Sequence, residues 1–317
     1  MAVRPLVRLL VPAHVPRNRV PAPGRALMIW GGMGVTMVFF LAWTVFPLGY
    51  AFLRSFYDWQ PLLGRHVYVG LRNYHEAIAI DPLFFAALRN TAHFALLNVA
   101  VGSALCLLVA LAINVTGRGN TFYRISFFLP VVCSEVGTAL IWRFMYQPRF
   151  GIINTALFTV ARALGVTNPP EIGWLTDPSW AMNSVVIYSL WKYLGFRMII
   201  LLAGLQAIPD VYYEAAQLDG AGRWSCLRHI ILPLLLPTLS FVLIIGVINS
   251  LQVFSQIYVM TAGGPGNATL SVVMLLYRAA FQMLRFGYAS AISFILFGII
   301  LVLTAIQLKV LRPSWEY

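Results

Sequence analysis

The sequence predicts an all-α integral membrane protein with six transmembrane helices. Of its 317 residues, 60% are hydrophobic and only 10% are charged, and the mean hydropathy is +0.79. These values are far from the balance of a soluble domain. A helix needs about 20 apolar residues to cross a bilayer. We place the transmembrane domain at residues 26–311, with spans at 27–53, 91–114, 127–146, 179–207, 234–260 and 287–308.

The first span follows a basic N-terminal tail. Residues 1–25 contain five arginines, several prolines and no acid, a composition that folds poorly and favours the cytoplasmic side of a membrane. Residues 26–53 then run for 28 positions without a charge. That length exceeds the core of a cleaved signal peptide and suffices to span the bilayer.

The next three spans are separated by polar loops. Residues 54–87 are polar and aromatic and predict an extracytoplasmic loop, whereas the short basic loop at 117–124 predicts a cytoplasmic one. The third span is followed by residues 147–178, which contain turn signals such as Asn-Pro-Pro. Lys192 and Arg197 interrupt the fourth span.

The fifth and sixth spans come from a longer apolar region. Residues 229–277 carry no formal charge apart from one histidine, and these 49 residues exceed one helix. The glycine-rich segment 261–266 divides them. We therefore expect a span at 234–260, a short interfacial helix at 270–282, the sixth span, and a C-terminal tail at 312–317.

A polar island at residues 208–233 lies between the fourth and fifth spans. It holds three of the ten acidic residues of the chain, Asp210, Glu214 and Asp219. A short helix is predicted over 211–218, a turn at the glycines that follow, and a second helix over 223–231. Such a unit is too short to be stable alone in water, so something must hold it. The alternative is a cytoplasmic loop that lies on the membrane surface.

The island has a spaced motif: Glu-Ala-Ala, three residues, Gly, nine residues, then Ile-x-Leu-Pro. It is carried by Glu214, Ala215, Ala216, Gly220, Ile230, Leu232 and Pro233. This motif resembles the cytoplasmic EAA loop of the permease subunits of binding-protein-dependent ABC importers. The resemblance implies coupling helices that dock into a groove on a separate ATPase, with the glutamate pairing a basic residue there. The implied ATPase-coupling residues are Glu214, Ala215, Ala216, Asp219, Gly220 and Gly222.

Other segments resemble sugar-importer permeases, in particular the MalF type. These are Gly-Leu-x-Asn-Tyr at 70–74, Asn-Thr at 90–91 and the glycine-rich stretch 261–269. Over residues 54–311 the resemblance implies a type I ABC importer permease fold. It also implies a heterodimer with a second permease subunit, two copies of an ABC ATPase, and an extracytoplasmic solute-binding protein or lipoprotein. The expected location is a bacterial or archaeal plasma membrane, with both termini in the cytoplasm.

The basic residues predict neither nucleotide nor nucleic-acid binding. Only two of the 22 are lysines and neither follows a glycine, so a Gly-Lys-Ser/Thr phosphate loop is excluded. We expect no catalytic residue and no cofactor in this chain, with ATP and Mg on the partner ATPase. Three cysteines without metal spacing predict no metal site. The net charge of +12 comes from residues at the ends of apolar runs, which are typical lipid-bilayer anchors.

Polar residues inside spans usually face a bundle interior or a water-filled path. Asn249, Gln252 and Gln256 recur at i, i+3 and i+7 of the predicted fifth span, and Tyr188 and Trp191 share a face of the fourth. Amides hydrogen-bond hydroxyl groups, and aromatic rings cover the apolar face of a sugar. We predict that these residues line a substrate path. The alternative is that the same stripes pack helix against helix.

Glu135 is the one acid deep in the predicted membrane region, and Lys192 lies in the fourth span. We predict either that the two side chains pair, or that one of them contacts a charged group of the substrate. Both are therefore candidate residues of the substrate path.

These observations predict the permease subunit of an ATP-driven importer for a sugar or sugar-like solute. A glycerol-phosphate derivative is an alternative solute. An ion-coupled secondary transporter is an alternative class, but it predicts paired intramembrane acids and two similar halves, and neither is present in the sequence. A membrane enzyme is a further alternative without a recognisable catalytic cluster.

Overall fold

The computed structural model describes residues 22–115, 120–166 and 170–311. Residues 1–21 of the predicted N-terminal tail and the whole predicted C-terminal tail, 312–317, therefore lie outside the described residues. The chain divides into two units, residues 1–53 and 54–317. In the first unit, α1 (Ala22–Phe40) continues through a π-helical turn (Leu41–Val45) into α2 (Phe46–Arg54). Pro47 lacks an N–H to complete the regular helical ladder, which accounts for the wider turn before it.

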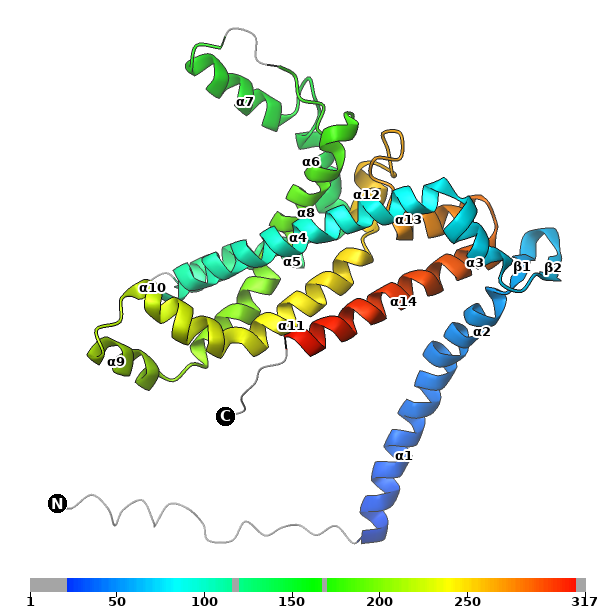
Figure 1. The fold of residues 1–317 in the computed structure, drawn as a ribbon, viewed down its shortest axis with the longest axis horizontal. Helices are drawn as coiled ribbons and strands as arrows, with labels where there is room; N and C mark the ends of the chain where they lie inside the picture. The colour runs from blue at the N-terminus through cyan, green and yellow to red at the C-terminus, as the bar shows by residue number, and fades with distance from the viewer. Residues whose placement is uncertain (1–21, 116–119, 167–169, 312–317) are drawn as a thin grey trace. The chain divides into compact units, whose positions relative to one another are not determined.

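The second unit is a helical bundle centred on α8 (Pro178–Gln206) (Figure 1). Its other long helices are α4 (Pro82–Val115), α11 (Leu232–Leu251) and α14 (Phe286–Val310). α4 packs against α8 and α11, and α11 packs against α14. In the most apolar part of α8, 56% of residues are buried, compared with 22% in α14. Because α14 is apolar, long enough to span and exposed at residues such as Phe297, Leu301 and Ile306, we assign its outer face to lipid.

The third predicted span is a bent pair of helices. α5 (Asn120–Val132) and α6 (Glu135–Met145) meet at an angle of 96°. α6 begins at the bend because Ser134 occupies its N-cap position, where its hydroxyl accepts a hydrogen bond from the Gly137 N–H. The described residues thus contain five helices that are long and apolar enough to span, and a sixth span if the bent pair counts as one. This confirms the predicted fold class.

Three spans begin several residues earlier than predicted, and for the third span the first residue is Asn120 and not residue 127. α4 begins at Pro82 and not near residue 91, because the Asp81 carboxylate accepts a hydrogen bond from the Leu83 N–H and starts the helix earlier. α11 is continuous with α10 (Arg223–Cys226) through a π-helical turn (Leu227–Ile231). The predicted short helix at 223–231 is therefore the first part of the fifth span.

The fifth span also ends earlier than predicted. α11 stops at Leu251, and α12 (Ser255–Met260) begins after a non-helical break. Backbone groups released by a break inside a membrane need new partners. The Ser271 hydroxyl provides one by donating to the Val253 carbonyl oxygen at 2.8 Å. The predicted helix at 270–282 is α13 (Val272–Tyr277) followed by a π-helical turn (Arg278–Gln282).

The loop between the bent pair and α8 contains α7 (Ile152–Ala163). Asn154 is buried and donates to the carbonyl oxygens of Pro148 and Ile172, while it accepts from the Trp174 indole. Asp177 then caps α8 by accepting from the Ser179 hydroxyl at 2.7 Å and from its N–H at 2.9 Å. The hydroxyl bond and then the backbone bond lower the pKa of the Asp177 carboxyl.

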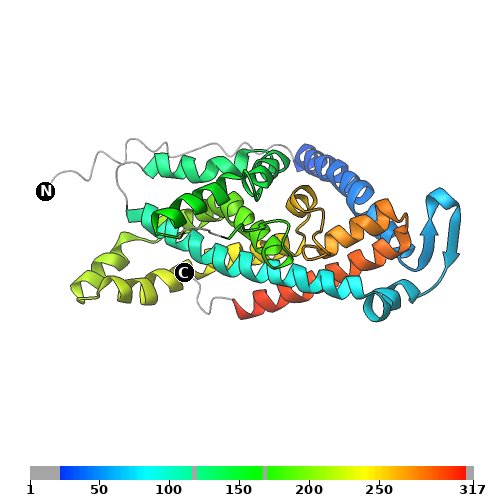
Figure 2. The same cartoon turned by 90° about the horizontal axis from the view of Figure 1, so that it is seen from above.

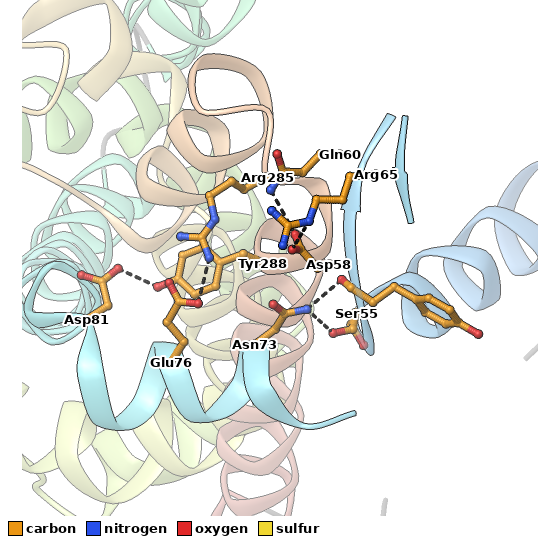
Figure 3. A network of polar contacts seen from close by, with 10 residues as sticks. Ser55, Asp58, Gln60, Arg65, Asn73, Glu76, Asp81, Arg285 and Tyr288 are labelled. Atoms are coloured by element: carbon orange, nitrogen blue, oxygen red, sulfur yellow. Dashed lines mark hydrogen bonds and ion pairs between the residues drawn. The ribbon is translucent and has the colours of Figure 1, made fainter. Parts of the chain in front are cut away.

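A β-hairpin lies at the start of the second unit, with β1 (Tyr57–Gln60) antiparallel to β2 (Arg65–Tyr68). α3 (Arg72–His75) and a π-helical turn (Glu76–Ile80) follow. Asn73 donates to the carbonyl oxygens of Ser55 and Tyr57, as Figure 3 shows. Arg285 pairs with Glu76 at 2.8 Å, and Tyr288 donates to Asp81 at 2.6 Å. These bonds fasten the hairpin segment to the start of α14.

The two polar ends of the second unit lie far apart. α9 (Asp210–Leu218) and α10 project at one end of the bundle, and the β-hairpin with α3 lies at the other, in both Figures 1 and 2. The predicted coupling loop and the Figure 3 network are therefore at opposite ends of the spanning helices.

Candidate functional site

A cavity of about 330 Å³ lies inside the second unit, between α4, α6, α8, α11 and α12. Its wall is mixed, with amide, hydroxyl, carboxylate and guanidinium groups beside aromatic rings. The polar lining residues are Asn98, Glu135, Tyr193, Arg197, Asn249, Gln252, Ser255 and Gln256, and the aromatic ones are Phe94, Phe196 and Phe254. This composition is that of a small-molecule site, in which apolar surface gives contact area and a few polar groups give orientation.

All three predicted residues of the fifth span line this cavity. They do not share one continuous helix, because Asn249 precedes the break, Gln252 lies within it and Gln256 follows it. Asn249 and Gln252 are exposed. Gln256 is largely buried and donates to the Ser189 hydroxyl at 3.4 Å. Two amides are thus open to a solute, and a direct contact with it stays a prediction.

The two aromatic residues predicted on α8 lie outside the cavity wall. Tyr188 is fully buried, shares a hydrogen bond with Thr138 at 2.9 Å and donates to the Glu135 carbonyl oxygen at 3.1 Å. Trp191 is 40% exposed and packs against Trp142 with ring centres 5.3 Å apart. Both residues join α8 to α6 in this structure.

The cavity uses the other face of α8, formed by Tyr193, Phe196, Arg197 and Ile200. Successive residues of a helix are rotated by about 100°, so Arg197 lies roughly opposite Tyr188 around the helix axis. From the sequence, Arg197 was predicted only to interrupt the span, and Tyr193 and Asn98 were not predicted to line a path. The sequence signal that could have identified these three residues as lining the cavity is that each is a polar or charged side chain within a predicted span.

The predicted pairing of Glu135 with Lys192 is wrong. Lys192 is buried, and its ammonium group donates to the carbonyl oxygens of Pro130 at 2.5 Å and Cys133 at 2.6 Å. Glu135 instead accepts a hydrogen bond from the Tyr193 hydroxyl at 2.7 Å. The α5 carbonyls freed at the bend compete successfully for the ammonium, because a helix C-terminus attracts cations.

The cavity has the chemistry of non-covalent recognition. Its amides and the Tyr193 hydroxyl can donate to and accept from hydroxyl groups, and its aromatic rings can cover an apolar face. Among residues 22–115, 120–166 and 170–311, no group of three or more His, Cys, Asp or Glu side chains is placed to hold a metal ion.

The second candidate site is the end of the bundle formed by α9 and the turn to α10. Gly220 closes α9 with a φ of +74°, the left-handed region that glycine adopts most easily. The Ala221 N–H donates to the Ala216 carbonyl oxygen at 2.9 Å, and the Gly220 N–H donates to the Gln217 carbonyl oxygen at 3.1 Å. This is a Schellman motif, which satisfies the last carbonyls of a short helix. Asp219 is its C-cap residue.

One face of α9 is uncovered in the chain. Val211, Glu214, Ala215 and Leu218 recur at i, i+3, i+4 and i+7 and are all exposed, with Leu218 at 90%. Ala216, which the resemblance also assigned to the ATPase contact, is buried within the chain at 6% exposure. The exposed face combines one carboxylate with two large apolar side chains, a composition suited to a partner protein.

Comparison with known proteins gives consistent matches. Residues 107–314 match the family described as binding-protein-dependent transport system inner membrane component. A probable ABC transporter permease of Pyrococcus horikoshii is 36% identical over 286 residues, which cover 90% of this chain and 91% of that protein. The trehalose/maltose transport system permease protein MalF of Thermococcus litoralis is 34% identical over 286 residues, covering 90% and 92%.

The fold is also similar to a solved structure. One chain of a bacterial ABC transporter involved in the import of the acidic polysaccharide alginate superposes with a TM-score of 0.80 and is 23% identical. The match covers 92% of this chain and 98% of that chain. The bundle described above is thus the fold of an ABC transporter subunit.

Proposed function

The chain belongs to the binding-protein-dependent transport system inner membrane components, and from this membership we propose that it conducts a sugar or sugar-like solute through the cavity beside α8. It is a multi-pass permease subunit of an ABC importer. Relatives named as trehalose/maltose, diacetylchitobiose and lactose transport permeases support the solute class. The amide and aromatic lining of the cavity supports it on chemical grounds.

We further propose that movement is imposed on this subunit through α9 and the turn that follows it. The observation that carries this proposal is the exposed face of Val211, Glu214, Ala215 and Leu218. A nine-residue helix held by a Schellman motif at the end of the bundle presents this face away from the chain's own core. Its apolar residues suit a groove, and Glu214 suits a basic residue in that groove.

The proposed assembly contains a second permease subunit and two copies of an ABC ATPase. ATP and Mg are bound by the ATPase, and an extracytoplasmic binding protein delivers the solute. In this arrangement α9 faces the cytoplasm, and the β-hairpin end faces the outside, because the two lie at opposite ends of the bundle. Both chain termini are then cytoplasmic.

A charge reversal on α9 tests the coupling proposal. Glu214→Lys should leave the subunit inserted in the membrane but abolish co-purification of the ATPase, because it replaces attraction by repulsion. Glu171→Lys is the matched control, since Glu171 is exposed on the loop before α8, at the end remote from α9. If Glu214→Lys retains the ATPase as fully as Glu171→Lys does, the docking role of this face is refuted.

A further inference from the structure

Arg197 is a cation held inside the membrane-spanning bundle. Its side chain is only 8% exposed, and it lines the cavity from the centre of α8. The bundle provides space for it at Gly102 on α4, where any side chain would collide with Arg197 Nη1. The guanidinium therefore occupies space between α4 and α8 that Gly102 leaves open.

No carboxylate neutralises this cation in the part of the chain that the structure describes. The ion pairs of Arg65 with Asp58 and of Arg285 with Glu76 do not involve it. Arg197 Nη1 donates one hydrogen bond, at 2.9 Å, to the Asn98 carbonyl oxygen. Glu135 lines the same cavity, but its Oε1 accepts from Tyr193 and it forms no ion pair with Arg197.

Burying a cation in a bundle without a neighbouring negative charge is energetically unfavourable. Removing a guanidinium from water is unfavourable unless another charge or several hydrogen bonds compensate. One bond to a neutral carbonyl uses a single donor of the five that arginine has. A chain that only had to join α4 to α8 at this point would do so more stably with a neutral side chain.

We propose that Arg197 selects solutes that carry a negatively charged substituent on the sugar, namely a carboxylate, phosphate or sulfonate. This rests on the proposed function of the cavity as a sugar path. The planar guanidinium matches the two oxygens of such a group and can bind them through parallel hydrogen bonds. Glu135 repels the anion and accepts from hydroxyl groups, so the two charges orient the solute along the cavity.

The test compares two sugars that differ at one carbon. Labelled glucuronate carries a carboxylate where labelled glucose carries a hydroxymethyl group. Retention of each is measured by equilibrium dialysis on the assembled importer in nanodiscs. We expect the wild-type complex to bind glucuronate about tenfold or more tightly than glucose, as one charge-assisted pair of hydrogen bonds provides. Arg197→Gln should remove the preference, and Arg197→Lys should keep part of it.

A second variant tests the same role in case Arg197→Gln does not fold. Gly102→Ala keeps the positive charge but displaces the guanidinium from its position, so it should also weaken the preference for glucuronate. Gly298→Ala on α14 is its matched control, because a side chain at Gly298 meets open space. Gel filtration of each complex confirms that it is assembled before dialysis.

Competition separates a charged sugar from a free anion. Unlabelled glucose 6-phosphate should displace glucuronate from the wild-type complex, whereas inorganic phosphate at the same concentration should not. Equal displacement by both would show a site for free anions and overturn the proposal.

The proposal is also overturned if the wild-type complex does not prefer glucuronate, or if Arg197→Gln keeps the preference. The proposed function fails in a different way: sugar uptake would then be unaffected by Gln252→Ala in the same cavity. A complex that needs Gln252 for uptake but binds neutral and charged sugars equally would retain the sugar path and reject the role of Arg197.

Discussion

The Lys192 ammonium group on α8 lies 2.6 Å from the Cys133 carbonyl oxygen and 2.5 Å from that of Pro130, at the bend between α5 and α6. Helix ends leave carbonyl groups without intrahelical partners, and a membrane interior supplies no water to satisfy them. A single buried cation on a neighbouring helix satisfies two of them here. Lys192 thus fastens the α5 side of the 96° bend to α8, while Tyr188 and Tyr193 bond to its α6 side.

Replacing this side chain should destabilise the bundle. We expect Lys192→Met to lower the free energy of unfolding by about 2–3 kcal/mol, because it leaves buried carbonyl groups unpaired. Thermal unfolding of the purified subunit in detergent measures the effect. Lys309 is the other lysine of the chain and is exposed at the end of α14, so Lys309→Met is the control. Equal unfolding temperatures for the two variants would show that the bend does not depend on Lys192.

Glu135→Gln should behave differently from the Lys192 variant. Glutamine keeps an acceptor for the Tyr193 hydroxyl, so the hydrogen bond survives and stability should change by less than about 0.5 kcal/mol. A large loss of stability in the same unfolding experiment would show that the charge of Glu135, and not its hydrogen bond, supports the fold.

The sequence predicted the number of spans and the polar island because both depend on long, unambiguous differences in hydropathy. It did not predict the bend at Ser134, although Pro130 and Ser134 lie in the segment, because residues 127–146 have the length and composition of a single span. The partner of Lys192 was missed for a related reason. Backbone carbonyls have no signature in the sequence, so Glu135 was the only visible candidate.

The cavity-facing side of α8 could not be chosen from the sequence either. A helix buried on most sides has no strong apolar face, and the stripe of Tyr188 and Trp191 is as periodic as the stripe of Tyr193 and Arg197. The two stripes lie on opposite sides of the helix, and only the positions of α4, α6 and α11 decide between them. The cavity-lining residues of the fifth span could be predicted because that span contains few other polar residues.

The contact between α5 and α8 should be intolerant of a side chain at Gly195. A methyl group there would collide with the backbone of Phe127, which cannot move as a side chain can. We expect Gly195→Ala to cost about 1–3 kcal/mol and to reduce the yield of folded protein on gel filtration. Gly298→Ala, where a methyl group meets open space, should have no effect. Normal yield and stability of Gly195→Ala would contradict the close approach of these helices.

Packing and cavity residues on neighbouring helices should be separable by kinetics. Gln252→Ala should raise the half-saturation concentration for uptake of a transported disaccharide by about two- to tenfold, which corresponds to one lost hydrogen bond. Its unfolding temperature should not change, because Gln252 is exposed to the cavity.

Tyr188→Phe should give the reverse result. It removes the hydroxyl that contacts Thr138 and Glu135, so stability should fall by about 1–2 kcal/mol while the half-saturation concentration stays constant. Uptake into proteoliposomes and thermal unfolding give the two readings. A Tyr188→Phe variant that changes only uptake would place this hydroxyl on the solute path.

The turn after α9 should depend on backbone conformation at Gly220. At a φ of +74°, asparagine is tolerated, alanine costs about 1–2 kcal/mol and a β-branched residue costs more. ATPase activity stimulated by the loaded binding protein should therefore decrease in the order Gly220→Asn, Gly220→Ala, Gly220→Val. Gly298 on α14 is the control, because it lies outside the coupling loop and no atom lies near its Cβ position. Gly298→Ala should retain full stimulation. If Gly220→Ala retains more activity than Gly220→Asn, the size of the side chain against the ATPase, and not the left-handed turn, determines coupling at this position.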